Sequence, residues 1–255
     1  MLAITRINEI KELIRQQKSV LVSDLAPRFG VTEETIRRDL KKLEDEGLVI
    51  RVYGGAYSTD GVQNDVNVTL RETILVDEKK LIAQRCLPFI ANGDSIFLDC
   101  STTALQLAAL LSRYTLTVIT NSLKVADCLA PHRDIRLVLI GGALHATSMS
   151  FLGQSATTAL AGYYVDKAFV SCRSLSIKNG ITDSNEDQSA VRRLAIRLSD
   201  QAFLLVDHTK FGQTSFSKVA ELTEVSTVIT DFPVAPTWRE YFLNHHIAYL
   251  DGSQE

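Results

Sequence analysis

With 255 residues the chain is long for one domain, and two unequal domains are the natural expectation. The hydrophobic content of 45% and the charged content of 22% are ordinary globular values, so the larger part can bury a core. No apolar run approaches the roughly 20 residues that a membrane-spanning helix needs, and no signal peptide opens the chain. We therefore expect a soluble, cytoplasmic protein that does not associate with a membrane.

From the spacing of the cysteines and from the glycine motifs, we expect neither a bound metal nor a cofactor. No P-loop and no GxGxxG motif is present, which argues against a kinase or a nucleotidase. The cysteines lack metal-type spacing and lie in apolar surroundings, so we interpret them as reduced thiols that pack in the core. They are Cys86, Cys100, Cys128 and Cys172.

Three helices are predicted in the first part of the chain. Apolar residues recur at helical spacing over residues 4–17, which predicts the first helix. Val20 and Val22 then predict a short strand. A second, short amphipathic helix covers residues 23–29 and ends at Gly30, and a third begins after a Thr32 cap.

The third helix has polar and basic side chains in its opening turns: Thr32, Thr35, Arg37 and Arg38. A helix that enters the major groove of DNA must offer phosphate partners and base-edge donors from these turns. A two-stranded segment follows, with Gly54-Gly55 at its tight turn. The pattern predicts that residues 1–57 form a winged helix-turn-helix that binds double-stranded DNA.

The net charge of this predicted domain is small. Residues 1–57 hold 10 Lys+Arg against 9 Asp+Glu, a net charge of +1, and the rest holds 17 against 21, a net charge of −4. The basic residues of the third helix nevertheless cluster. Neutralising only a few phosphates per subunit leaves DNA affinity modest and salt-sensitive, so we expect a homo-oligomer, a dimer or a tetramer.

Residues 58–76 are predicted to be a linker, because Ser58–Asn67 is polar and has no apolar periodicity. In residues 77–255 short apolar runs alternate with amphipathic helices, which indicates a mostly parallel sheet covered on both faces. The predicted strands are 95–99, 116–120, 135–140, 167–171, 203–206, 227–230 and 248–250. The predicted helices are 78–90, 103–111, 122–129, 154–162, 188–199 and 237–245, and the stretches after 142 and before 188 are predicted to be irregular.

Small, hydroxylated, amide and charged residues follow the predicted strands, and ligands of such sheets bind outside the carboxyl ends of the strands. Ser101, Thr102 and Thr103 join a strand to a helix, where backbone N–H groups attract an anion. These features favour a pocket for a small phosphorylated polyol. In this hypothesis Gly141 and Gly142 allow a close approach of the backbone, Lys210 or Arg173 supplies countercharge, and Asp99 or Glu186 accepts sugar hydroxyls.

Structural roles remain open for each of these residues. Ser101 and Glu186 are also suited to the start of a helix, and Gly141-Gly142 to a plain turn. Asp99 is equally a turn residue, Lys210 a surface lysine, and Arg173 the partner of an acid.

The segment VTEETIRRDLKKLEDEGLVIRVYGGA resembles the helix-turn-helix signature of the DeoR family of bacterial sugar-operon regulators. The segments LDCSTTALQLA, TVITNS, VLIGGAL, GITDSNEDQSAVRR and LLVDHTKFG resemble blocks of that family in the family's order. The resemblance covers nearly the whole chain. It implies a sensor domain related to ribose-5-phosphate isomerase, in which a phosphorylated sugar binds and weakens operator binding.

The resemblance also implies roles for particular residues. Thr35, Arg37, Arg38 and Lys41 fall where the recognition helix of the family faces DNA, and Arg51 and Tyr53 fall in the wing. Asp99, Ser101, Thr102, Thr103, Asn121, Gly141, Gly142, Glu186 and Lys210 align with effector-pocket positions. The chain departs from the family at Tyr53, at Ser101 and at Ser171-Cys172-Arg173-Ser174, where many members have His, Gly and Gly-x-Asp-Gly, and the last departure bears on which sugar fits.

We therefore expect a DNA-binding transcriptional repressor of a carbohydrate-utilisation operon, released from its operator by a phosphorylated sugar. A phosphosugar isomerase is the contrasting hypothesis, with Asp99, Glu186 and Lys210 as the available bases. Because no paired-acid motif is evident, we expect no enzymatic activity. An activator built from the same parts is a third alternative.

Overall fold

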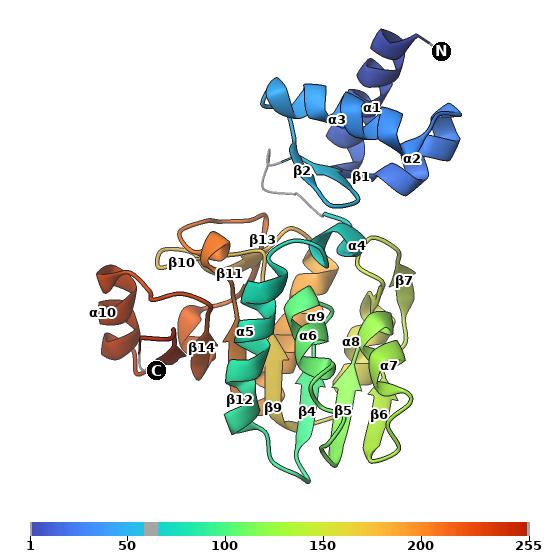
Figure 1. Cartoon of the computed structure of the whole chain (residues 1–255). Helices are drawn as coiled ribbons and strands as arrows, with labels where there is room; N and C mark the ends of the chain where they lie inside the picture. The colour runs from blue at the N-terminus through green and yellow to red at the C-terminus, as the bar shows by residue number, and fades with distance from the viewer. Residues whose placement is uncertain (1, 59–65, 254–255) are drawn as a thin grey trace. The chain divides into compact units, whose positions relative to one another are not determined.

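The computed structural model describes residues 2–58 and 66–253. Contacts divide the chain into two compact units, Met1–Val76 and Asp77–Glu255. In Figure 1 the colour runs from blue to teal along the first unit and from teal to red along the second. None of the helices in the described residues has the length and apolarity that a membrane span requires.

The first unit is a winged helix-turn-helix, as the sequence predicts. Its helices are α1 (Ala3–Gln17), α2 (Val22–Phe29) and α3 (Glu33–Asp45). Its antiparallel sheet has the order β1 (Ser19–Leu21), β3 (Gly55–Tyr57), β2 (Ile50–Val52), so the strand after α1 pairs with the wing.

Two local features fix the turn between α2 and α3. Gly30 ends α2 in the left-handed region at φ 62°, where glycine carries no steric penalty. The Thr32 side chain accepts a hydrogen bond from the Thr35 backbone N–H and so caps α3. The apolar faces of the three helices then meet in one core, in which Ile10, Ile36, Leu40 and Leu43 are almost fully buried.

The wing depends on Gly55. A Cβ atom at this position would lie 2.1 Å from the Val20 carbonyl oxygen and 2.8 Å from Leu70. Only a residue without a side chain therefore lets β3 approach β1 this closely. Gly54, at φ 95°, makes the turn between β2 and β3.

A buried ion pair joins the first and third helices. Arg6 of α1 donates from Nε to Asp39 Oδ2 of α3 at 2.6 Å, and both side chains are less than a tenth exposed. In the sequence, Asp39 stands between the exposed Arg38 and the exposed Lys41 of α3. By holding Asp39 inward, the ion pair keeps these two basic residues on the outer face of the helix.

Part of the predicted linker is folded. Residues 59–65 lie outside the described residues, but Val68–Arg71 form helix α4, with Val68 and Leu70 buried. The Asn67 backbone N–H donates to Ser19 Oγ, and Thr73 Oγ1 donates to the Tyr53 carbonyl. This part of the linker therefore packs on the wing.

The second unit contains a parallel seven-stranded sheet, in agreement with the sequence analysis. Its order is β15-β14-β12-β9-β4-β5-β6. The strands are β4 (Ser95–Leu98), β5 (Leu116–Thr120), β6 (Ile135–Leu139), β9 (Val165–Val170), β12 (Ser199–Leu205), β14 (Thr227–Ile229) and β15 (Ala248–Leu250).

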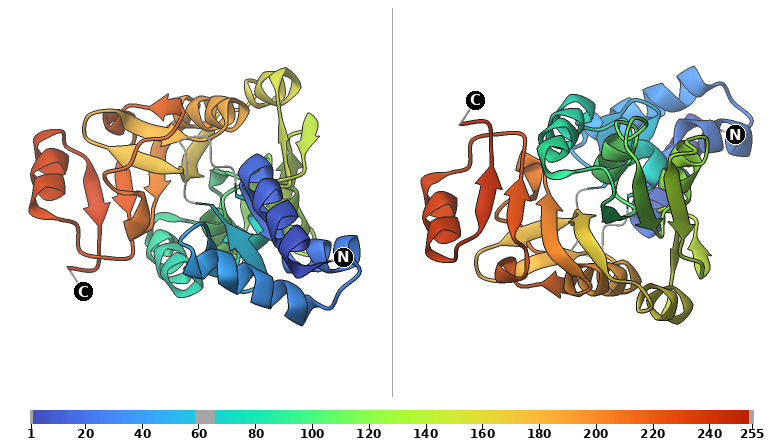
Figure 2. Two further views of the ribbon diagram at one scale, coloured as in Figure 1. Left: turned by 90° about the horizontal axis from the view of Figure 1, so that it is seen from above. Right: turned by 90° about the horizontal axis from the view of Figure 1, so that it is seen from below.

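Helices cover both faces of this sheet (Figure 2). Helices α5 (Val76–Cys86), α6 (Thr102–Ala108) and α7 (Leu123–Leu129) contribute to one buried apolar cluster. Helices α8 (Gln154–Leu160), α9 (Glu186–Arg197) and α10 (Pro236–Asn244) contribute to the other. The predicted helices all occur, with ends shifted by a few residues.

The two stretches predicted to be irregular contain short strands. β7 (Ala143–His145) and β8 (Ser150–Leu152) form a hairpin. β10 (Ser174–Ser176), β11 (Gly180–Asp183) and β13 (Ser217–Ala220) form a separate antiparallel sheet. Strands of three or four residues are too short to show an alternating pattern, and β13 pairs with a strand far away in the sequence, so the sequence analysis missed them.

The chain order of the large sheet places a topological switch point between β4 and β9. From β4 the chain builds β5 and β6 on one side and then returns to add β9 on the other. Crevices at the carboxyl ends of the strands form where the order reverses in this way, and ligands of such sheets bind there.

We expect Asp39→Ala to destabilise the first unit by about 3–5 kcal/mol, because it leaves the Arg6 guanidinium buried without its partner. Hydrogen exchange of the α1 and α3 amides measures this loss. As a control, Glu12→Ala removes an exposed partner of Arg15 and should change stability by no more than about 0.5 kcal/mol. Equal exchange rates in Asp39→Ala and wild type would show that the pair does not stabilise the unit.

Candidate DNA-contacting surface and effector site

Helix α3 separates a buried face from an exposed one. Ile36, Leu40 and Leu43 pack in the core, whereas Arg37, Arg38 and Lys41 of the same helix are exposed. At the start of the helix, Thr32 Oγ1 lies 3.0 Å from Thr35 Oγ1, and both hydroxyls stand beside the first-turn N–H groups. The predicted contact residues of this helix thus share its accessible side.

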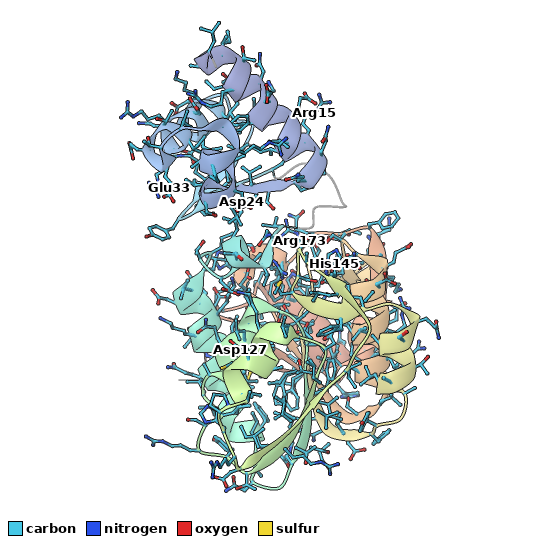
Figure 3. The ribbon with its side chains drawn as sticks, turned by 90° about the vertical axis from the view of Figure 1, so that its right-hand side faces the viewer. Arg15, Asp24, Glu33, Asp127, His145 and Arg173 are labelled. Carbon is cyan, nitrogen blue, oxygen red and sulfur yellow. The ribbon has the colours of Figure 1, made fainter. Side chains whose placement is uncertain are left out.

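The exposed arginines of α3 pair within their own helix. Arg37 Nη2 lies 2.6 Å from Glu33 Oε2, and Arg38 Nε lies 3.6 Å from Glu34 Oε1. Figure 3 labels Glu33 at the start of the helix. Exposed pairs at this spacing contribute only about 0.3–0.5 kcal/mol, so both guanidinium groups remain available to an external anion.

The two predicted wing residues differ in their surroundings. Tyr53 is 87% exposed at the wing turn. Arg51, in contrast, donates from Nε to Glu44 Oε2 at 2.7 Å and from its backbone N–H to Glu44 Oε1 at 3.2 Å. The side-chain hydrogen bond from Arg51 lowers the pKa of Glu44 below its usual value. Arg51 therefore ties the wing to α3, a structural role that the sequence analysis did not include.

In the second unit, Ser101 caps helix α6 and the two threonines follow it. Ser101 Oγ accepts a hydrogen bond from the Ala104 N–H at 3.0 Å. Thr102 and Thr103 are buried, and the hydrogen bonds of the described residues use neither of their hydroxyls. At the end of β4, Ser101 therefore caps the helix, whereas the hydroxyls of Thr102 and Thr103 have no hydrogen bond among the described residues.

The Asp99 carboxylate, which was predicted to accept sugar hydroxyls, is engaged by groups of the protein itself. Its side chain is 1% exposed, and both carboxylate oxygens are occupied. Oδ1 accepts from the Ser101 N–H, and Oδ2 accepts from the Ser171 N–H at 3.0 Å and from Arg192 Nε at 2.7 Å. Asp99 thus joins the ends of β4 and β9 at the switch point.

Arg192 of α9 is a central residue that the sequence analysis missed. Its guanidinium is 4% exposed and lies 2.7 Å from Asp99 and 2.5 Å from Asp183 Oδ2. Burial acts to lower the pKa of Arg192, but the charges of Asp183 and Asp99 outweigh it and hold the pKa above its ordinary value. In the sequence, Arg192 is indistinguishable from the neighbouring arginines of a solvated helix face.

Two carboxamides beside this cluster have unpaired atoms. Asn121 follows β5 and donates from Nδ2 to the Phe151 carbonyl at 3.1 Å, but its Oδ1 is buried without a partner among the described residues. Gln188 of α9 accepts at Oε1 from Arg192 Nη1 at 3.4 Å, and its Nε2 is buried without a partner there. Asn121 was predicted; Gln188 was not.

The diglycine after β6 has a structural explanation. A Cβ at Gly142 would lie 2.7 Å from the Leu152 carbonyl oxygen, so the absence of a side chain lets this turn pack against the end of β8. Gly141 has open space around it, and both glycines are exposed. Gly142 therefore allows a close approach of the backbone to another part of the protein, the end of β8.

Lys210 lies in the short 3-10 helix His208–Lys210, with its Nζ 3.8 Å from Asp207 Oδ2. Burial acts to raise the pKa of Asp207, but the charge of Lys210 and hydrogen bonds from Thr209 outweigh it and lower the pKa. The charge of Lys79, from α5, also lowers it. Asp207 and Lys79 were not among the predicted residues.

The remaining two predicted residues lie in different settings. Glu186 is exposed in the first turn of α9, directly after the cap residue Asn185. A negative charge at this position interacts favourably with the helix dipole. Arg173 is half-buried, and its backbone N–H donates to Asp183 Oδ2 at 3.1 Å. Its guanidinium has no hydrogen bond or ion pair with the described residues. Figure 3 shows Arg173 and His145 at the same end of the second unit.

The Cys172 thiol, which follows β9, is affected by several charged groups of the site. Burial raises the pKa of the Cys172 thiol well above its ordinary value, and the charges of Asp183, Lys210, Arg192 and Asp207 act on it as well. The charges of both ion-paired groups, Asp183–Arg192 and Asp207–Lys210, therefore act on the segment that follows β9. No group of three or more His, Cys, Asp or Glu in the described ranges is arranged to hold a metal ion.

Comparisons with known proteins agree with this division of the chain. Residues 6–62 match the family model of the DeoR-like helix-turn-helix domain, and residues 75–232 match that of the DeoR C terminal sensor domain. Together the two models cover most of the chain.

Solved structures resemble the second unit only distantly. Ribose 5-phosphate isomerase A from Methanocaldococcus jannaschii is 17% identical, with a TM-score of 0.40, over 54% of this chain and 55% of that chain. The eIF2B delta subunit from Chaetomium thermophilum has a TM-score of 0.48 at 13% identity, over 66% and 59%. Similarities of this size carry no argument about function.

Curated relatives extend over nearly the whole chain. An uncharacterized HTH-type transcriptional regulator of Bacillus subtilis, YulB, is 42% identical over 92% of both chains. The transcriptional repressor GlcR of Bacillus subtilis is 34% identical over 89% of this chain and 87% of its own, and the lactose phosphotransferase system repressor of Staphylococcus epidermidis 32% over 89% and 91%. The chain therefore belongs to the DeoR family of helix-turn-helix transcriptional regulators.

Proposed function

We propose that this regulator represses a carbohydrate-utilisation operon and leaves its operator when a phosphorylated sugar binds to the sensor domain. The observation that carries the proposal is the coexistence of an accessible basic helix on a winged helix-turn-helix with a polar, partly unsatisfied site at the switch point of the sensor sheet. Repressor relatives of sugar systems support the assignment of repression over activation.

On the DNA side, α3 enters the major groove. Its exposed Arg37 and Arg38 exchange their intrahelical glutamate partners for phosphates or base edges, while Thr32, Thr35 and Lys41 contact the backbone. Tyr53 at the wing turn contacts the neighbouring groove or its phosphates. Arg51 acts indirectly, by holding the wing against α3 through Glu44.

A homo-oligomer, with a dimer as its unit, binds the operator. One helix with a few basic residues neutralises few phosphates, and two helices on two half-sites add their contacts. We assign DNA binding to residues 1–57, extended by the folded part of 66–76, and effector sensing to residues 77–255. The protein then works in the cytoplasm, where both DNA and sugar phosphates occur.

In the sensor domain, the Thr102 and Thr103 hydroxyls and the N–H groups of their turn bind the phosphate. Lys210 and Arg173 supply positive charge, since the half-buried Arg173 guanidinium has no partner among the described residues and Lys210 stands at the same strand ends. Asn121 contacts the sugar, Asp99 holds the strand ends in place, and Gly142 shapes the β6–β7 turn.

Effector binding is proposed to occur without catalysis. Isomerisation needs a base beside a carbon-bound proton of the substrate. Asp99 has both oxygens engaged in hydrogen bonds, and Glu186 is exposed at the start of α9, so neither carboxylate is free within the site.

We expect Arg38→Ala to weaken operator binding on the order of 10- to 100-fold, as the loss of one good arginine contact in each half-site does. Fluorescence anisotropy with DNA from upstream of the protein's own gene measures this. Arg15→Ala, which removes an equally exposed arginine from α1, should leave the affinity unchanged. An unaltered affinity in Arg38→Ala would reject α3 as the recognition helix.

Lys210→Ala should bind the operator normally but need roughly 10- to 100-fold more inducer for release, because a charge-assisted hydrogen bond to the phosphate is lost. The inducer is first identified by release of wild-type protein with a panel of sugar phosphates. Lys178→Ala, an exposed lysine of the same domain, is the control. A normal response of Lys210→Ala would exclude Lys210 from the site.

Incubation of the protein with aldose and ketose phosphates should give no interconversion, since no carboxylate base is free at the site. Nuclear magnetic resonance of the sugar mixture detects any product. Turnover that scales with protein concentration would instead establish the isomerase alternative.

A further inference from the structure

The Gln188 side chain is held in one orientation by its neighbours. Its Oε1 faces Arg192 Nη1 at 3.4 Å and Cys100 Sγ at 3.8 Å, and both of these atoms are donors. The reversed amide would turn its NH₂ group toward the Arg192 guanidinium, donor against donor. The Gln188 NH₂ group therefore points away from Arg192, and at 3% exposure it has no partner among the described residues.

Asn121 is oriented in the complementary sense. Its NH₂ group donates to the Phe151 carbonyl, which leaves Oδ1 as an acceptor without a donor among the described residues. The residue is 1% exposed. The site thus contains one buried donor and one buried acceptor, each fixed by a hydrogen bond at the other end of its amide.

The register of the sheet brings these two side chains into the same region. Leu98 of β4 pairs with Thr120 of β5, so Asp99 and Asn121 are the next residues of adjacent strands, which lie about 4.8 Å apart. Gln188 contacts Cys100, one residue further along from β4. Both residues therefore lie next to the strand end that leads into the loop of Ser101, Thr102 and Thr103.

A donor and an acceptor together select a particular chemical group. Phosphate and carboxylate oxygens of an anion accept hydrogen bonds, so they satisfy the Gln188 NH₂ group but not Asn121 Oδ1. A hydroxyl both accepts and donates, and adjacent hydroxyls of a polyol satisfy both amides at once. Unpaired buried polar groups are rare in folded proteins, which points to an occupant of this kind.

We propose that Gln188 is a specificity-determining residue of the effector site, where its NH₂ group donates to a hydroxyl oxygen of the sugar and Asn121 Oδ1 accepts from that hydroxyl or its neighbour. The inference rests on the proposed sugar-phosphate function and adds that Gln188 and Asn121 recognise hydroxyl groups of the sugar. The buried Asp99–Arg192–Asp183 cluster acts as the support that orients Gln188.

The test compares the affinities of the full-length protein for sugar phosphates and for inorganic phosphate. Calorimetry is run with D-fructose 1-phosphate, D-fructose 6-phosphate, D-ribose 5-phosphate, glycerol 3-phosphate and inorganic phosphate. Wild type should bind at least one sugar phosphate on the order of 100-fold more tightly than inorganic phosphate. Gln188→Met should reduce that ratio about tenfold or more, with the inorganic phosphate affinity unchanged, because a site built to bond a hydroxyl loses discrimination with its donor.

The control is Gln154→Met, which changes an exposed glutamine at the start of α8 and should keep the wild-type ratio. If circular dichroism shows that Gln188→Met does not fold, Gln188→Leu replaces it, since leucine is uncharged and also lacks the NH₂ donor. The same loss of ratio is expected.

Three results would overturn the inference. They are a wild-type protein that binds no sugar phosphate more tightly than inorganic phosphate, a folded variant that keeps the wild-type ratio, and a folded variant that loses both affinities equally. The proposed function fails separately, through absent operator binding or absent release in the DNA assay. Normal release by a sugar phosphate with an unchanged ratio in the variant would reject Gln188 alone.

Discussion

The sensor domain depends on one buried guanidinium. Arg192 lies between Asp99 and Asp183, and through them it connects helix α9 to the ends of β4, β9 and β11. Two carboxylates share this one cation and also accept backbone N–H groups, so removal of Arg192 would leave two buried carboxylates without a counter-charge. The carboxyl ends of the central strands are thereby held at fixed positions relative to α9.

This constraint explains why the polar site forms at the centre of the sheet. The strand order reverses between β4 and β9, and the loops that leave these strands diverge there. The ion cluster occupies the base of that region and orients Gln188. Asn121 stands on the neighbouring strand end. A site with fixed amides discriminates between ligand groups better than one whose side chains reorient, because less conformational freedom is lost on binding.

Much of the helix-turn-helix unit and the parallel sheet could be predicted because their signals are local. The Thr32 cap, the spacing of Ile36, Leu40 and Leu43, and Gly30 specify α3 and its exposed face within about fifteen residues of sequence. The apolar runs of the buried strands are equally local. The short strands β10 and β11 were missed because three or four residues show no alternating pattern, and β13 was missed because it pairs with a strand that is distant in the chain. Helix α4 was missed because only its neighbours explain its burial.

The sequence by itself determined the two-part organisation, the family, helix α3 with its exposed face, and the strand ends at which polar residues gather. Periodicity, caps and motif order are properties of neighbouring residues, so they can be read without a structure. Only the tertiary structure decided which polar residues are partnered. Asp99 is hydrogen-bonded to Arg192, and Arg51 is hydrogen-bonded to Glu44. Gly142 packs against the end of β8. Gln188 and Asn121, in contrast, each have one side-chain atom without a partner among the described residues. Partners are chosen by proximity in space, which the linear order of residues does not contain.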